Sequence, residues 1–216
     1  MPRNGVYAAV ASIALIASGC GLSTSSPQAS STSTTAKSTP FVGTQNISRA
    51  ATAKIQQVNG VGWDPTNGIE GSVPSSCHAI GGDVAMALPD PKCTPGAIDT
   101  QVTQANIYST ICRYGYTKTV RPPVSISESF KSQIMSAYGY SDSMSKYELD
   151  HLIPLELGGA STAANLWPEL NNHPSSYYLN SKDMAENELH VEVCSGKITL
   201  AQAQYEIATD WTRVLV

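Results

Sequence analysis

The sequence predicts an α+β domain with a small strand–strand–helix core, flanking helices and disulfide cross-links. Residues 148–194 have the pattern of a strand, a loop, a second strand and a helix. Residues 125–138 and 199–214, on either side, carry apolar side chains at helical spacing. Four cysteines follow residue 45, and an even number of cysteines in an exported protein is typical of a disulfide framework.

The first nineteen residues have the pattern of a bacterial lipoprotein signal peptide. Arg3 precedes an apolar run from Val6 to Ala17, which is too short to span a bilayer stably. Small residues then precede Cys20, and this pattern is similar to a lipobox. We expect residues 1–19 to be removed and Cys20 to carry a lipid anchor, so that the protein faces the outside of the cytoplasm. The alternative is ordinary signal cleavage and a soluble secreted protein.

A tether and a region of weak pattern come next. Twelve of the seventeen residues from Ser23 to Thr39 are serine or threonine, a composition that cannot bury a core. We therefore expect residues 20–45 to be a flexible tether. Residues 46–93 are rich in glycine and proline, and no function is assigned to them. Residues 94–216 form the expected functional domain.

Two helices are predicted beside the central segment. The first begins with a capping box at Ser125 and Glu128 and ends at Gly139. Its apolar face consists of Phe130, Ile134 and Tyr138. The second begins with a capping box at Thr199 and Gln202. Its apolar stripe consists of Leu200, Ala203, Ile207, Trp211 and Val214.

The four cysteines after Cys20 allow three disulfide pairings. The favoured pairing joins Cys77 to Cys93 as a local loop. It then joins Cys112 to Cys194 as a staple between the region before the central segment and its helix. No C-x-x-C pair is present, so neither a zinc ribbon nor a thioredoxin-like motif is supported.

The central segment sets an acidic residue beside a histidine. Residues Glu148 to Leu157 are strand-like, the loop begins at Gly158, and a short strand from Asn165 to Trp167 is expected to stop at Pro168. A helix from Ser176 to Cys194 follows. Since neighbouring side chains point to opposite faces of a strand, Asp150 and His151 can share a site only at a strand end or a distortion.

This order of elements and residues resembles the HNH nucleases, also called ββα-metal or His-Me finger nucleases. It is most similar to exported bacterial HNH-like proteins that carry DHLIPLELGG and NLWPE, followed by a helix with KD, E, L and VC. The likeness runs from about Thr94 to Trp211. Matching positions are Asp150 to Gly159, Asn165 to Glu169, Lys182, Asp183, Glu186, Leu189, Val193, Cys194, Gly196, Leu200, Ala203, Gln204, Asp210 and Trp211.

The resemblance implies a role for each motif residue. His151 would be the general base that takes a proton from the attacking water, a task that suits an imidazole near neutral pH. Asp150 would bind one divalent ion, and Mg²⁺ is expected because hard cations take oxygen ligands, with Mn²⁺ and Zn²⁺ as alternatives. Asn165 would pin the loop and orient the histidine. Glu148 lies on the same strand face as Asp150 and would support it, or would be a surface charge.

The metal ligand on the helix is the least well matched position. The family pattern places a histidine or asparagine about nine residues after the motif asparagine, where this chain has Pro174. The first candidate is His173 and the second is Asn180. If neither reaches the ion, the site is degenerate.

The charge of the chain does not suggest strong nucleic-acid binding. The chain has 13 basic and 17 acidic residues, and residues 141–216 contain only four of the basic ones. Phosphate backbones are normally met by lysine and arginine, so we expect weak, salt-sensitive and non-specific binding. The candidate contacts are Arg113, Lys118, Arg121 and Lys131.

Two functional hypotheses follow. The first is a metal-dependent HNH-type endonuclease that hydrolyses DNA, or alternatively RNA, outside the cytoplasm. The second is a catalytically degenerate envelope lipoprotein that keeps the fold as a binding or structural module. No protein partner is indicated. Lys182 and Glu186 are most simply interpreted as a pair on a solvated helix face, Trp167 and Trp211 as core anchors, and His190 as an ordinary surface residue.

Overall fold

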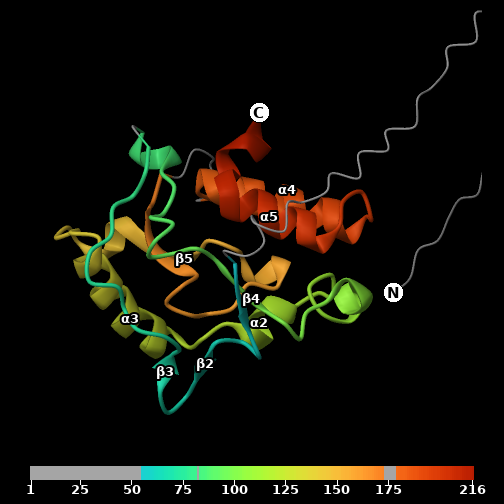
Figure 1. Ribbon diagram of the computed structural model, residues 1–216, viewed down its shortest axis with the longest axis horizontal. Coiled ribbons are helices and arrows are strands. Elements are labelled where there is room, and N and C mark those ends of the chain that lie inside the picture. The colour runs from blue at the N-terminus through green and yellow to red at the C-terminus, as the bar shows by residue number, and fades with distance from the viewer. Residues whose placement is uncertain (1–54, 82, 173–178) are drawn as a thin grey trace, which may run out of the picture. The chain divides into compact units, whose positions relative to one another are not determined.

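The centre of the fold is a hairpin of two antiparallel strands, β5 (Tyr147–His151) and β6 (Leu166–Leu170). The computed structural model describes residues 55–81, 83–172 and 179–216. Helix α4 (Ser181–Cys194) comes after β6, so the predicted order of strand, strand and helix is present. Together with the other helices and small sheets this is an α+β fold, as predicted (Figure 1).

The remaining elements are short and lie around this hairpin. The other helices are α2 (Tyr116–Val120), α3 (Val124–Ala137) and α5 (Leu200–Asp210). The other strands are β1 (Gln56–Val58), β2 (Trp63–Asp64), β3 (Gly68–Ile69) and β4 (Ala97–Asp99). Strands β1 and β4 pair in parallel, and β2 and β3 pair antiparallel. The 3-10 turns are η1 (Val84–Met86), η2 (Gln104–Ser109), η3 (Met144–Lys146), η4 (Leu155–Leu157) and η5 (Trp211–Leu215).

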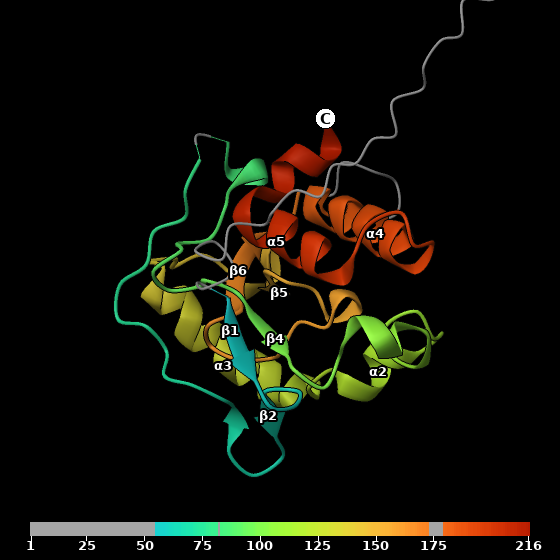
Figure 2. The same ribbon diagram turned by 45° about the vertical axis from the view of Figure 1, so that its right-hand side comes forward.

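The hairpin lies between two helical layers. Helices α4 and α5 lie side by side on one side of β5 and β6, and α3 lies on the other side (Figures 1 and 2). Phe130 and Ile134 of α3 are buried in one cluster with Leu166 and Trp167 of β6. The register pairs Glu148 with Glu169, which places both carboxylates on the same face of the hairpin.

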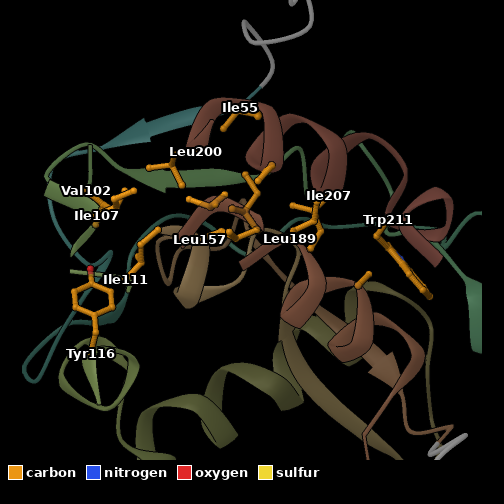
Figure 3. Packing of buried hydrophobic residues seen from close by; sticks show 14 residues of the cluster. Ile55, Val102, Ile107, Ile111, Tyr116, Leu157, Leu189, Leu200, Ile207 and Trp211 are labelled. Carbon is orange, nitrogen blue, oxygen red and sulfur yellow. The ribbon is translucent and has the colours of Figure 1, made fainter. Parts of the chain in front are cut away.

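The larger core cluster lies between the two C-terminal helices and the chain before α3. Figure 3 shows residues from α4, α5 and η5 meeting residues from η4 and the segment around η2. Trp211 and Ile207 are completely buried there. The apolar stripe predicted for the last helix is therefore confirmed as a core face, and so is the capping box at Thr199.

The loop between β5 and β6 is held by backbone hydrogen bonds from the N-terminal part of the described chain. The amide of Ser161 donates to the carbonyl of Val61, and the amide of Ala163 donates to Glu70. On the other side, the amide of Ala160 donates to Ala97. The segment before residue 94 thus contributes backbone contacts, from Val61 and Glu70, to the loop between β5 and β6.

The disulfides join Cys77 to Cys93 and Cys112 to Cys194, which is the pairing favoured from the sequence. Such cross-links are consistent with an exported protein. Within the described ranges, no helix combines the length and apolarity needed to cross a bilayer. Cys20, residues 1–45 and His173 lie outside the described residues, so the lipid anchor, the tether and the first-choice metal ligand stay predictions.

The ends of both strands differ from the expected ones. Strand β5 ends at His151, and Leu155–Leu157 form the turn η4, because Pro154 interrupts the ladder. Pro168 lies inside β6 rather than stopping it. Within the described chain β6 has β5 as its only strand partner, and a proline is tolerated on such an edge strand.

The two helix starts also differ from prediction. Helix α3 begins at Val124, directly after Pro123, and Ser125 does not cap it. Proline is pre-organised for the first turn of a helix, so the helix starts one residue before the expected cap. Helix α4 begins at Ser181 instead of Ser176, with Asn180 as its N-cap.

Candidate active site

Asn165 fixes the loop that follows β5. Its side-chain oxygen accepts hydrogen bonds from the amides of Ile153 and Ala97, at 2.9 and 3.2 Å. Its side-chain nitrogen donates to the carbonyls of Ile153 and Ala160, at 2.9 and 3.0 Å. The residue is fully buried. An amide is required here because the site needs two acceptor contacts and two donor contacts from one side chain.

His151 is the last residue of β5 and is buried beside that loop. Its Nε2 atom lies 2.9 Å from the hydroxyl of Ser161, which is itself fully buried. Among the described residues no hydrogen bond to Nδ1 is present. Burial lowers the pKa of His151 to about 3, and the charges of Arg121 and Lys182 act in the same direction. The imidazole is therefore neutral at any ordinary pH.

Asp150 points away from His151, toward α4. Its Oδ2 atom accepts a hydrogen bond from the indole nitrogen of Trp167 at 2.7 Å and lies 2.9 Å from the ammonium of Lys182. Burial raises the pKa of Asp150, and Lys182 opposes that rise. The two adjacent motif side chains thus occupy opposite sides of the strand end.

Lys182 is the feature that the sequence did not reveal. Its side chain is fully buried, so the interpretation as a solvated helix face is wrong. The ammonium donates to the carbonyl of His151 at 2.8 Å and contacts both Asp150 and Glu186. Burial lowers the pKa of this ammonium, but the charges of Asp150 and Glu186 outweigh burial, so the pKa lies above its ordinary value. The predicted ion pair with Glu186 is present, but it is buried.

More carboxylates surround this ammonium than one positive charge can balance. Burial, followed by the charge of Asp150, raises the pKa of Glu148 to about 7. The same causes raise the pKa of Glu169 to about 10. Neither carboxylate oxygen of Glu169 has a hydrogen-bond partner among the described residues, although both are buried. The face of the hairpin toward α4 therefore has an excess of acidic groups, which must be met by protons or by a cation.

Of the two helix candidates for the metal, the structure describes Asn180. Its side chain is buried at the start of α4, where it contacts Glu148 and accepts a hydrogen bond from the amide of Asn172. It thus lies beside the acidic face. Glu169 was missed as a member of that face. Glu169 could have been found from its pairing with Glu148 across the two strands, but that pairing can be predicted only when the strand register is known.

Three of the four candidate phosphate contacts are exposed. Arg113, Lys118 and Arg121 lie along or next to α2, and Arg121 is close enough to His151 to influence its pKa. Lys131 differs, because its side chain is only 9% exposed and its ammonium lies 3.6 Å from Glu128. Of the exposed basic residues, Arg121 is thus the one that the structure relates to His151.

The acidic face does not have the spacing of a preformed metal centre. Across the described ranges, the one group of three ligand atoms within 4.8 Å of one another is Cys112, His190 and Cys194. Its sulfurs form a disulfide, and a disulfide sulfur is not the thiolate that binds metals.

No family model, curated protein or solved structure matches the chain. Function is therefore inferred from side-chain geometry and from the sequence motif.

Proposed function

We propose that the protein is a metal-dependent endonuclease of the HNH type that hydrolyses phosphodiester bonds of DNA, with RNA as the alternative substrate. The supporting observation is the arrangement of His151, Asp150 and Asn165 in a strand–strand–helix unit. Metal-assisted hydrolysis requires a neutral imidazole with a free ring nitrogen and a carboxylate for the ion. Here they lie at the same strand end but on its opposite sides, so the substrate would have to reach around that end to meet both.

His151 would act as the general base. In that role its proton resides on Nε2 and is donated to the hydroxyl of Ser161, which leaves the lone pair of Nδ1 for a water. The low pKa keeps the base neutral but makes it weak. A bound phosphodiester brings negative charge next to His151, and this charge raises the basicity when it is needed.

The acidic face toward α4 would hold one divalent cation. The carboxylates of Asp150, Glu169 and Glu148 offer the oxygen ligands that Mg²⁺ prefers, and the partnerless oxygens of Glu169 fit such an ion. When bound, the ion would stabilise charge on the phosphate and the leaving oxygen. Asn180 contacts Glu148 from the start of α4 and would complete the polar lining.

The exposed basic residues would bind the substrate backbone. Arg121 influences the pKa of His151, and Arg113 and Lys118 lie near it in the sequence, beside and on α2. Three positive charges favour weak binding that is lost as salt rises, without sequence preference. The disulfides and the pattern of residues 1–20 support action outside the cytoplasm, with a lipid anchor at Cys20 as part of the proposal.

One observation favours the second hypothesis, a degenerate module that binds a partner without catalysis. The ammonium of Lys182 already pairs with Asp150, which is the expected metal ligand. An internal ammonium can replace a metal ion as the counter-charge of a carboxylate cluster. In that case the fold would be kept for its shape and its surface.

Cleavage of supercoiled plasmid by the oxidised full chain separates the two hypotheses. The reaction is run with Mg²⁺, with Mn²⁺ and with EDTA, for wild type and for His151→Ala. We expect nicking that requires metal and falls by about 10²- to 10⁴-fold in His151→Ala, the usual contribution of a general base. His78→Ala is the matched control, because His78 is exposed and far from the motif in sequence.

Each other outcome has a definite meaning. A folded wild type that cleaves nothing with either metal refutes the nuclease and leaves the binding module. Equal cleavage by His151→Ala and His78→Ala refutes His151 as the base. A thermal-shift titration with Mg²⁺ on wild type and Asp150→Asn then tests the acidic face, since equal shifts would exclude Asp150 as a ligand.

A further inference from the structure

A second cluster of metal-ligand side chains lies at the other end of α4, and it is independent of the proposed nuclease site. One ring nitrogen of His190 and the sulfurs of Cys112 and Cys194 all lie within 4.8 Å of one another. His190 and Cys194 are four residues apart on α4, so they share one face of the helix. Cys112 approaches that face from the segment after η2.

The hydrogen bond of His190 prepares its ring for metal binding. Its Nε2 atom lies 3.0 Å from the carbonyl oxygen of Ile111. A carbonyl can only accept, so Nε2 carries the proton and Nδ1 keeps the lone pair. A backbone carbonyl that fixes the tautomer of a histidine in this way is a common second partner of metal-bound histidines.

We propose that reduction of the Cys112–Cys194 disulfide turns this cluster into a binding site for Zn²⁺ or another thiophilic cation, with His190 as the third ligand. The disulfide and the metal-bound form exclude each other, because only thiolates bind the ion. A phosphine reductant consumes one disulfide and one water and yields two thiols and a phosphine oxide. The two thiols then lose their protons as the ion binds.

The geometry requires only a small rearrangement. Zinc–sulfur bonds of about 2.3 Å in a tetrahedral site place two sulfurs about 3.7 Å apart. The Cα atoms of Cys112 and Cys194 are 5.6 Å apart, so rotation of the two side chains supplies the extra separation. All three residues are half-buried, so a reductant and an ion can reach them while the helix stays packed.

Among the described residues no fourth histidine, cysteine or carboxylate lies within the same 4.8 Å of all three ligand atoms. Water would therefore fill the fourth coordination position. The bound ion would link Cys112 to α4 and so would replace the lost cross-link.

The test is Co²⁺ and Zn²⁺ binding by the full chain before and after treatment with a phosphine. We expect no binding to the oxidised protein, and one Co²⁺ per reduced chain with the charge-transfer absorption of cobalt–thiolate bonds. Zn²⁺ should displace the Co²⁺ and raise the Tm of the reduced protein. The variant C77S/C93S serves as the matched control and should bind equally well, whereas C112S/C194S should not bind.

The role of His190 is tested separately by His190→Ala, which should weaken Co²⁺ binding by at least about tenfold. Binding by reduced C112S/C194S, or no binding by reduced wild type that is folded, overturns the proposal. If reduction unfolds the wild type, circular dichroism decides the question. Recovery of the helical signal with Zn²⁺ supports the site, and failure to recover it overturns the site.

Discussion

Replacing Lys182 with methionine should destabilise the protein by about 3–5 kcal/mol at pH 7, the cost of removing one partner of a buried ion pair. The ammonium is fully buried and contacts Asp150, Glu186 and the carbonyl of His151. Methionine keeps most of the length of the side chain, so the loss of charge dominates over any loss of packing. Two carboxylates would then remain buried without their counter-ion.

The loss of stability in Lys182→Met should depend on pH, because the carboxylates left without their counter-ion can take up protons. Without Lys182 the folded-state pKa values of Asp150 and Glu186 rise further, since burial already raises both. The folded variant then binds more protons than the unfolded chain, so its stability falls as the pH rises above about 4. The difference from wild type should therefore be smaller at pH 5 than at pH 8.

Urea unfolding of the oxidised proteins measures this effect. With a slope near 2 kcal/mol per molar, the expected loss moves the midpoint down by about 1.5–2.5 M. Lys197→Met is the control, because Lys197 forms its ion pair with Glu192 at the surface, and its midpoint should hardly change. A midpoint shift below about 0.5 M for Lys182→Met, or one equal at both pH values, would refute the reasoning.

Three further changes give expected outcomes for stability. Asn165→Ala should cost at least about 3 kcal/mol in urea unfolding, because two amides and two carbonyls lose buried partners; a loss under 1 kcal/mol would contradict it. The Tm should fall as the pH rises from 5 to 7. The pKa of Glu148 is about 7 in the folded protein and 4.5 ordinarily, so in this range the folded protein keeps a proton that the unfolded chain has released. The stability lost through Glu148 is about 3 kcal/mol. Glu148→Gln should reduce the slope, with a remainder from Glu169, whose pKa is about 10; an unchanged slope would exclude Glu148 as a cause. Removing the Cys112–Cys194 disulfide, with a sequence separation of 82, should lower the free energy of unfolding by about 4.5 kcal/mol. Removing Cys77–Cys93, with a separation of 16, should lower it by about 3 kcal/mol. The reverse order in calorimetry would be evidence against the chain-entropy estimate.

The sequence predicted those features that depend on local spacing. Ile207 of α5 and Trp211, the first residue of η5, are core residues because the helical period of the sequence places them on one face. Both disulfides have the favoured pairing, with Cys77–Cys93 as a local loop and Cys112–Cys194 as a staple to the helix of the central segment. Trp167 is buried as expected, although it also donates to Asp150, a contact that no local pattern indicates.

The features that depend on packing between distant segments were not predicted. Lys182 and Glu186 form the expected pair at a spacing of four, but Lys182 is also held by Asp150 and by the carbonyl of His151, 31 positions away in the sequence. Glu169 meets Glu148 only through the strand register, and the strand was expected to end before it. His190 was predicted to be a surface residue, although the favoured Cys112–Cys194 pairing already brings Cys112 to the helix face that His190 shares with Cys194.

The hydrogen bonds between the hairpin loop and the segments around Val61 and Ala97 limit how the protein can be divided. A fragment that begins at residue 94 would lack the partners of Ser161 and Ala163, so it would present the side of the loop next to His151 to water. Cutting the chain between Cys77 and Cys93 is different, since the disulfide keeps both halves together. A nicked molecule of two covalently linked pieces should therefore keep its shape, whereas a clean truncation at residue 94 should not.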